Sequence, residues 1–416
     1  LGRSNIPNQI AHFMLFASAI IEVILALLVG VPLLIYRLRA RRWQKLPLEF
    51  PGESCDLPLV IILPIWNEAL VIEKKLTDLT REYQFNTSLL IIDSASTDNS
   101  VELAEQWLKD NPSAFSSSRV VVMPERLGKT AAVKLAIDDL SDNSFEGLVL
   151  MTDADALITA GTIHRLHGWF ADASIGVVGS SAVRKTSLHG ESNYRSLYEF
   201  LRVAESKVDS TPFLEGSCMM WRHGSFNSSD LNIASNADDA QIASLVRLSG
   251  LKSIHDMESS FVDFAPTTID GQRRQKIRRA QGLQNMLEAQ SKHPQVSEHG
   301  EFSKILKMQY YLHCIAPLIL FQLVVTVAFR WSYVTITGMP VGFAALTHAV
   351  LALCELIILT SWLTHRNGIR LPFVAFVGTL ATSFEYLFIA KYRNLQGRQS
   401  NIWDQHEDVR KLLKEF

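Results

Sequence analysis

The chain has 416 residues, of which 48% are hydrophobic and 20% are charged, and its formal net charge is −2. A chain so close to neutral lacks the basic excess that binding to a nucleic acid backbone needs, so we expect no nucleic acid partner. The four cysteines show no paired spacing, which argues against a disulfide framework and against a cysteine metal site.

Four long apolar segments constrain the architecture. The first, residues 13–36, contains one charged side chain, Glu22, and is long enough for a membrane span of about 20 residues. It is too long for a signal-peptide core and lacks a small-residue cleavage site, so we predict a retained membrane helix. The other segments are residues 311–329, 341–363 and 371–390. Glu22, Glu355 and Glu385 lie inside such segments, where carboxylates either line a polar channel or pair near helix ends.

The composition between these segments predicts three parts. Residues 1–46 form an N-terminal transmembrane helix with a basic flank, residues 47–290 form a globular domain, and residues 291–416 form a membrane region of about three helices with a polar tail. A domain of that size can bury a substantial core of its own. We therefore predict an integral membrane protein that contacts membrane lipids and carries one soluble domain.

The basic residues around the spans predict the orientation. Several follow the first span and only Arg3 precedes it, which by the positive-inside rule places the globular domain in the cytoplasm. Those that follow are Arg37, Arg39, Arg41, Arg42 and Lys45. Three later spans would put the C-terminus outside, whereas Lys391, Arg393 and Arg398 favour the inside. The two signals agree only if one apolar segment is re-entrant or lies along the membrane interface.

The globular domain alternates short apolar runs with segments of helical spacing. The apolar runs are residues 59–63, 89–92, 120–123 and 148–151, and the helical segments are residues 68–81, 98–109 and 130–140. This alternation predicts an α/β fold with a mostly parallel, Rossmann-like sheet that is covered on both faces. In such sheets, ligands bind at the carboxyl ends of the strands, where this chain has Asn67, Asp93, Asp153 and Asp155.

Asp153 and Asp155 directly follow the fourth apolar run. In a strand, residues i and i+2 point to the same face, so the two carboxylates converge and repel each other unless a cation or a proton lies between them. This pattern is typical of a divalent metal site that holds a phosphate-bearing substrate. An aspartate pair also occurs in turns and helix caps, so the motif alone leaves both interpretations open. The neighbouring strand ends, with Asn67 and Asp93, favour the metal site.

Lys129 lies in the segment Leu127-Gly128-Lys129-Thr130, which resembles the end of a phosphate-binding loop. That loop needs a glycine five residues before Gly128, and Met123 stands there, so we exclude a nucleoside triphosphatase. A lysine at the start of a helix can still meet a diphosphate. The alternative is a solvated lysine in the first turn.

Two further polar clusters follow. Asp238 and Asp239 stand at the start of a predicted helix over residues 238–249, where capping explains one acid and a general base explains a second. Gln275, Arg278 and Arg279 belong to a basic helical segment ahead of the second membrane run. Contact with lipid headgroups is the default interpretation of that segment, and stabilisation of a departing diphosphate is the alternative.

Taken in order, these residues resemble the family 2 inverting glycosyltransferases in their membrane-integrated branch. That branch includes cellulose, chitin and hyaluronan synthases and the ceramide glucosyltransferases. The resemblance covers residues 57–282 and rests on motifs in the expected order. These motifs are Pro64-x-x-Asn67-Glu68, Asp93 to Asp98, Gly128-Lys129 with Ala132, Asp153-Ala154-Asp155, Asp238-Asp239 with Gly250, and Gln275-x-x-Arg278-Arg279.

The resemblance implies a nucleotide-sugar glycosyltransferase fold of type A, embedded between transmembrane helices, and a role for each matched residue. Asp239 would be the general base, and Asp155 with Asp153 would hold Mg2+ or Mn2+. The donor, expected to be UDP-linked, would contact Pro64, Asn67, Glu68, Asp93, Lys129 and Asp153. The diphosphate and the acceptor would contact Asp238, Gln275, Arg278 and Arg279.

The sequence departs from the family pattern at two positions, one in the nucleotide-binding segment and one that bears on the acceptor. Ser94 replaces a second aspartate that usually follows Asp93, and Arg279 replaces a tryptophan. Because Arg279 cannot offer the same flat apolar platform for a sugar ring, a lipid or short glycan acceptor is favoured over a processive polysaccharide synthase with coupled translocation. A non-catalytic membrane scaffold that binds nucleotide sugar is a third hypothesis. Asp239 argues against it, because binding needs no base.

Overall fold

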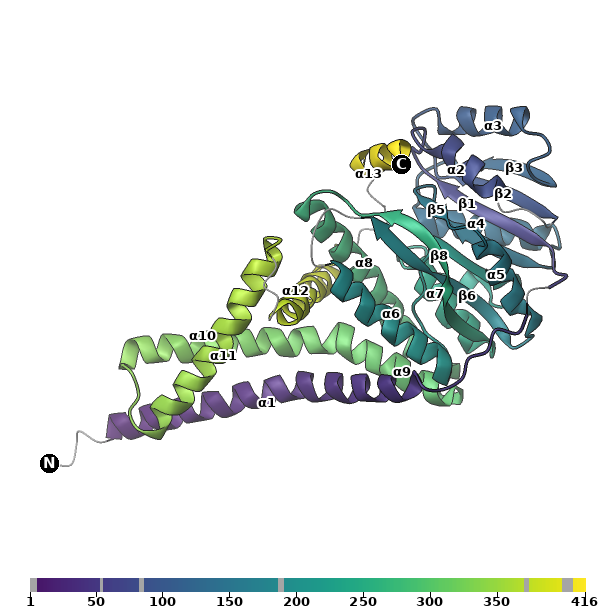
Figure 1. Cartoon of the computed structure of the whole chain (residues 1–416). Coiled ribbons are helices and arrows are strands. Elements are labelled where there is room, and N and C mark those ends of the chain that lie inside the picture. Colours follow the sequence, from purple (N-terminus) through teal and green to yellow (C-terminus); the bar gives the residue numbers. More distant parts are fainter. Residues whose placement is uncertain (1–5, 53–54, 82–85, 186–190, 370–373, 399–406) are drawn as a thin grey trace.

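An eight-stranded sheet lies at one end of the molecule, and long helices extend away from it (Figure 1). The structure, a computed structural model, describes residues 6–52, 55–81, 86–185, 191–369, 374–398 and 407–416. The strand order is β3-β2-β1-β4-β7-β6-β8-β5. The strands are β1 (Leu59–Ile65), β2 (Thr87–Asp93), β3 (Ser117–Val122), β4 (Leu148–Thr152), β5 (Ala156–Ile158), β6 (Ile175–Lys185), β7 (Cys218–Arg222) and β8 (Lys252–Phe264).

The direction of the strands changes in the middle of the sheet. β1 pairs in parallel with β2 and β4, and β2 pairs in parallel with β3. β7 runs antiparallel to both β4 and β6, while β8 is parallel to β6 and antiparallel to β5. The predicted α/β fold is confirmed, and its parallel half is built from the four apolar runs. The reversal at β7 matters for the site, because it sets Cys218 opposite Thr152 at the carboxyl end of β4.

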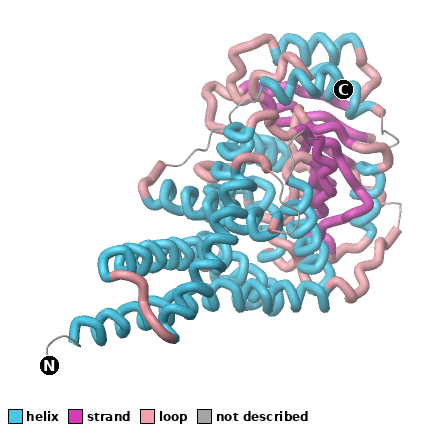
Figure 2. Tube along the Cα trace, turned by 60° about the vertical axis from the view of Figure 1, so that its left-hand side comes forward, coloured by secondary structure: helices cyan, strands magenta, loops and turns pink. Residues whose placement is uncertain are grey.

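Helices cover both faces of this sheet, which explains the continuous apolar strands (Figure 2). Alternate residues of β1 enter different cores: Leu59, Ile61 and Leu63 pack with α2, whereas Val60 and Ile62 pack with α4. The helices of this part are α2 (Ile72–Thr80), α3 (Ser100–Asp110), α4 (Lys129–Asp142), α5 (Thr162–Gly168), α6 (Glu191–Val208), α7 (Asp238–Leu248), α8 (Ile269–Gln290) and α9 (Gly300–Tyr310).

Three helical stretches of the described chain are long and apolar enough to cross a membrane. They are Phe13–Trp43, Gly300–Thr337 and Phe343–Arg366. The first belongs to α1 (Ile6–Trp43), the second includes α10 (Ala316–Thr337), and the third is α11 (Phe343–Arg366). α1 and α10 lie side by side, and α11 crosses them (Figure 1). These helices correspond to the first three predicted apolar segments.

The fourth predicted segment, residues 371–390, overlaps α12 (Ala375–Leu395) and begins outside the described residues. α12 packs along α8, where Leu387 and Ala390 contact Ile277 and Ala280, and Gln284 Nε2 donates to the Leu387 carbonyl at 2.8 Å. The last helix, α13 (Glu407–Glu415), lies against the sheet domain (Figure 1). If the two candidate spans after the sheet domain both cross a membrane, the chain returns to the side of that domain, which agrees with the basic residues after α12.

The carboxylates in the apolar segments are paired. The Arg330 side chain in α10 is only 1% exposed, and its Nε lies 2.8 Å from Glu22 of α1. Its other nitrogens contact Glu355 and His348 of α11. Glu385 of α12 contacts Arg273 of α8 at 2.9 Å. Of the two interpretations that the sequence left open, these contacts agree with pairing.

Replacement of Arg330 by leucine is expected to destabilise the helix assembly, because it leaves the buried Glu22 and the half-buried Glu355 without a cation. Loss of one partner of a buried ion pair costs about 3–5 kcal/mol. The thermal unfolding midpoint of the detergent-solubilised protein measures this. The control is Arg39→Leu in α1, since Arg39 is exposed. Equal midpoints for the two variants would show that the cluster does not hold the helices together.

Candidate functional site

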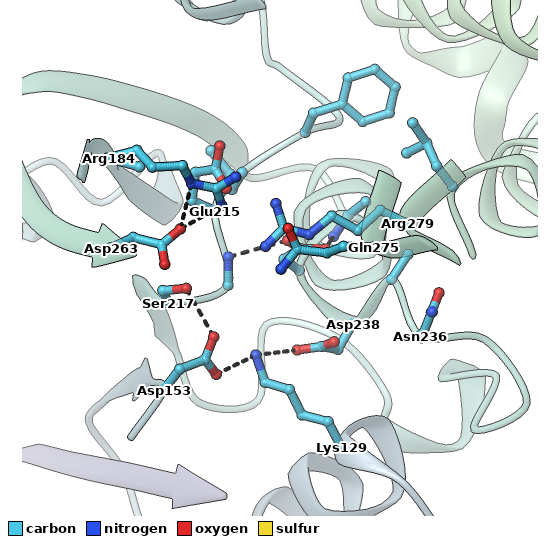
Figure 3. Close-up of a pocket in the computed structure, with 18 of the residues that line it drawn as sticks. Lys129, Asp153, Arg184, Glu215, Ser217, Asn236, Asp238, Asp263, Gln275 and Arg279 are labelled. Carbon is cyan, nitrogen blue, oxygen red and sulfur yellow. Dashed lines mark hydrogen bonds and ion pairs between the residues drawn. The ribbon is translucent and has the colours of Figure 1, made fainter. Parts of the chain in front are cut away.

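Most of the predicted site residues line one cavity of about 320 Å3 at the carboxyl ends of β1 and β4. Figure 3 shows several of these side chains pointing toward one another from α4, α7, α8 and the end of β4. The predicted residues that line it are Pro64, Glu68, Lys129, Asp153, Asp155, Asp238, Asp239, Gln275, Arg278 and Arg279. Asn67 and Asp93 do not line it.

Lys129 is the cation at the centre of this cavity. Gly128, whose φ of 94° lies in the left-handed region, precedes α4 and turns the chain so that Lys129 starts the helix. Its Nζ lies 2.6 Å from Asp153 and 3.3 Å from Asp238 (Figure 3). Burial lowers the pKa of Lys129, but the charges of Asp153 and Asp238 outweigh burial and leave the pKa raised. Lys129 is therefore charged, and the solvated lysine is ruled out.

Asp153 follows β4 and meets two partners. Besides the ion pair with Lys129, it accepts a hydrogen bond of 2.8 Å from the Ser217 hydroxyl. The register between β4 and β7 places Ser217 there, a contact that strand patterns alone did not predict. Burial raises the pKa of Asp153, but Lys129 and Ser217 outweigh burial and hold it below its ordinary value. Asp153 is therefore ionised, as a carboxylate that binds a metal must be.

Asp155 and Glu68 share a cation that sequence reasoning did not find. Arg410 of α13 binds Glu68 through two hydrogen bonds of 2.6 and 3.0 Å, and its Nη1 lies 3.1 Å from Asp155. Burial raises the pKa of Asp155 and raises that of Glu68 to about 7, although Arg410 acts in the opposite direction on both. The only sequence signal was the helical spacing of Val409 and Leu413, which are both buried.

Asp238 and Asp239 begin α7 and face the cavity. Ala237 precedes the helix without a side-chain cap, and both acids stand in the first turn, where the helix N-terminus stabilises negative charge. Asp238 points to Lys129, while Asp239 accepts hydrogen bonds from the backbone amides of Gly216 at 3.1 Å and Ala240 at 2.7 Å. Burial, and then the charge of Asp238, raise the pKa of Asp239 to about 7. A carboxylate with such a pKa suits proton transfer near neutral pH.

Asn67 and Asp93 are engaged in the loops that follow β1 and β2. The Asp93 carboxylate accepts from the Ser96 amide at 2.9 Å and from the Ser96 hydroxyl, and Asp93 is only 1% exposed. The Asn67 Oδ1 accepts from the Thr97 amide at 2.7 Å. The strand ends are close together, as predicted, but the side chains of both residues bind the loop that follows β2.

The far side of the cavity combines paired charges with an apolar end. Arg202 pairs with Glu215 at 2.6 Å, and Arg184 donates to Asp263 at 3.0 Å through Nε. Near them, Gln275 and Arg279 extend from α8 into the cavity (Figure 3). The apolar lining includes Phe213, Leu283 and Leu387, together with Leu214, Phe264 and Val409. Apart from Gln275 and Arg279, sequence reasoning missed these residues, because they come from separate elements that meet only in the folded chain.

The carboxylates at the end of β4 fit a divalent cation only in part. No cluster of three or more histidine, cysteine, aspartate or glutamate side chains within the described ranges forms a complete metal site. Asp153 and Asp155 supply hard oxygen ligands, which Mg2+ and Mn2+ prefer. Because Mg2+ commonly uses one or two carboxylates together with substrate phosphates, this pair fits a metal that arrives with a diphosphate.

Comparison with known proteins identifies the class. Residues 60–229 match the family model described as Glycosyl transferase family 2. The mannosyltransferase PcManGT from Pyrobaculum calidifontis, solved in complex with GDP-Man and Mn2+, is 27% identical. Its match covers 92% of this chain and 100% of that chain, with a TM-score of 0.71. S. aureus TarS in complex with UDP-GlcNAc is 12% identical over 84% of this chain and 94% of that chain, with a TM-score of 0.43. No curated protein sequence matches significantly.

The mixed sheet with polar strand ends and the shared cavity define a nucleotide-sugar glycosyltransferase domain with the type A fold. The chain carries a glycosyl transferase family 2 domain, and helices long enough to span a membrane flank it on both sides. The resemblance found in the sequence is thereby confirmed.

Gly282 of α8 tests whether the position of α7 matters for the site. A Cβ at this residue would lie 1.9 Å from Asn236 Oδ1 and 3.1 Å from the Ala237 amide nitrogen, directly ahead of Asp238 and Asp239. Gly282→Ala is therefore expected to displace the start of α7, to cost about 1–3 kcal/mol of stability, and to lower turnover. The control is Gly300→Ala, whose Cβ would meet nothing within 4 Å. Thermal unfolding and release of nucleoside diphosphate measure both effects, and equal behaviour of the two variants would contradict the expectation.

Proposed function

We propose that this protein is a membrane-bound inverting glycosyltransferase that moves a sugar from a nucleotide diphosphate sugar to a hydroxyl of a lipid acceptor. The observation that carries the proposal is the meeting of the Asp153/Asp155 pair, Lys129 and Asp239 in one cavity. The positive charge of Lys129 can contact a phosphate, and the Asp239 carboxylate, whose pKa is about 7, can accept a proton. Transfer of a sugar from a diphosphate needs both groups.

The donor end of the cavity offers charges of both signs. Asp153 and Asp155 would hold Mg2+ or Mn2+, which when bound supplies positive charge to the diphosphate. Lys129, already fixed by Asp153 and Asp238, would contact a phosphate oxygen and offset negative charge as the diphosphate leaves. Arg278 and Arg279 of α8 are the cations on the opposite wall. In this interpretation, part of the basic segment serves the leaving group.

Asp239 is proposed as the general base. Its carboxylate is held by two backbone amides, so its position is defined before the acceptor arrives. It would accept the proton of the acceptor hydroxyl, whose oxygen attacks the anomeric carbon while the bond to the diphosphate breaks. Because a single in-line displacement has one attack on that carbon, the configuration inverts.

The apolar end of the cavity supports a lipid acceptor. Leu283 of α8 and Leu387 of α12 line it, and α12 in turn contacts α10 and α11. An acyl or isoprenoid chain can therefore extend from the cavity toward the candidate membrane spans while its polar end meets Asp239. A growing glycan is the second acceptor class. The exposed Arg279, in place of the tryptophan of polymer synthases, does not favour it.

Asp239→Asn is expected to lower kcat by about 100-fold to 10,000-fold, which is the usual contribution of general acid–base catalysis. The wild-type enzyme should lose activity as pH falls through about 7, because protonation of Asp239 removes the base. Below that pH, kcat/KM should fall about tenfold per pH unit. Released nucleoside diphosphate measures both effects. Unchanged turnover in Asp239→Asn would remove the proposed base.

The donor is tested with a panel of GDP- and UDP-linked sugars in the presence of Mg2+ or Mn2+. The similarity to a protein solved with GDP-Man supports GDP-mannose as the first donor, and the motif resemblance supports UDP-linked sugars as the second set. Asp155→Asn should raise the metal concentration needed for half-maximal turnover. Mass analysis of extracted lipids separates one added sugar from a ladder of oligomers. No turnover with any donor in folded protein would contradict the proposed activity.

A further inference from the structure

The C-terminal helix α13 is docked firmly on the catalytic domain. Val409 is 2% exposed and Leu413 is 0% exposed, and both belong to the main core of the sheet. Lys74 Nζ donates to the Leu413 carbonyl at 2.8 Å, and Thr267 donates to Asp408 at 2.6 and 2.8 Å. These contacts use apolar burial and hydrogen bonds together, so they define one docked position for α13.

This position places Arg410 between two strand ends of the donor site. Arg410 is 5% exposed and lines the cavity together with Val409. Glu68 follows β1 and Asp155 follows β4, and these two strands are neighbours in the sheet. Ligands of parallel sheets bind outside the carboxyl ends of neighbouring strands. Arg410 therefore occupies the position at which a donor diphosphate would bind.

Lys129 and Arg410 pair with the carboxylates at this site, where two cations face the four carboxylates Asp153, Asp238, Asp155 and Glu68. Lys129 pairs with Asp153, and Arg410 pairs with Asp155, so each carboxylate of the metal motif already has a cation. Together the two side chains supply two positive charges, which equals the charge of one divalent ion. Arg410 also pairs with Glu68, which is only 3% exposed, so its single charge is shared between two carboxylates.

We propose that α13 is a cap on the donor site and that Arg410 competes with the divalent cation and its nucleotide for Asp155 and Glu68. The proposal rests on the donor site assigned above. In the donor-free protein, Arg410 keeps the carboxylates paired and α13 docked. Binding of the cation with a nucleoside diphosphate displaces Arg410 from Asp155, and α13 leaves the mouth of the site.

Electrostatics give the reason for the competition. A divalent ion on Asp155 would stand within a few ångströms of the Arg410 guanidinium, and two positive charges at that separation repel strongly in a partly buried site. The bidentate pair with Glu68 resists displacement, because breaking it leaves a buried carboxylate without a partner. The cap therefore opens only when the metal and the diphosphate together supply new partners for the charged groups that Arg410 leaves. The site would then be less exposed to solvent when no donor is bound.

The first test is Mn2+ binding to the full chain with saturating GDP, and separately UDP, measured from the electron paramagnetic resonance signal of free Mn2+. Arg410→Met removes the charge and keeps the stem, and we expect it to lower the Kd for Mn2+ by about tenfold or more. The matched control is Lys411→Met on the same helix, where Lys411 is 64% exposed and pairs with Glu407. It should bind within about twofold of wild type. If Arg410 instead held the diphosphate, Arg410→Met would bind more weakly, and the cap would be wrong.

The second test needs no variant. Hydrogen exchange of α13 amides is followed in the wild-type chain alone and with Mn2+ and GDP or UDP, with α5 as the internal reference. Faster exchange in α13 on binding is expected, while α5 stays unchanged. Unchanged or slower exchange in α13 would overturn the cap. If the wild type binds neither Mn2+ nor nucleotide, both the proposed donor site and the cap are wrong. If it binds them without faster exchange in α13, only the cap is wrong.

Discussion

The ion pairs of Lys129 are the interaction on which the site depends. Asp153 ends a central strand and Asp238 begins a helix far along the chain, and two such carboxylates in a buried cavity repel each other without a cation between them. Lys129 lies within 2.6 and 3.3 Å of them. It therefore links the end of β4 to α7, which carries Asp239. Gly128 and the start of α4 fix the position of Lys129. Through its contacts with Asp153 and Asp238, Lys129 therefore helps to position the proposed base, Asp239, relative to the sheet.

Buried hydrogen bonds and apolar packing join the sheet domain to the long helices. Glu205 of α6 is fully buried, accepts from Tyr36 of α1, and lies 2.6 Å from Gln309 of α9. α8, which carries Gln275 and Arg279, packs on α12 through Gln284 and Ile277. The cavity wall is thus continuous with the membrane region. An acceptor that enters from a lipid layer would meet the site along α8 and α12, without passing through the parallel half of the sheet.

Particular residues show how far the sequence could be interpreted. The strand ends at Asn67, Asp93 and Asp153 were predicted to meet because parallel strands align their carboxyl ends, and they do lie on neighbouring strands. The side-chain partners were not predictable: Asp93 binds Ser96, and Asp153 binds Ser217. The fourth apolar segment was ambiguous because hydropathy alone does not separate a span from a helix that packs on a protein surface. Arg410 was missed because nothing in its local pattern says which surface α13 covers.

The sequence by itself determined the α/β alternation, the order of the polar motifs and the family that they indicate, because these depend on periodicity and spacing along the chain. Tertiary structure decided which charges neutralise one another. Lys129 bridges two carboxylates, Arg330 pairs with glutamates of two other helices, and Arg410 reaches the cavity from the last helix. Coulomb interactions depend on distance in space, and the fold brings these residues together from distant parts of the chain.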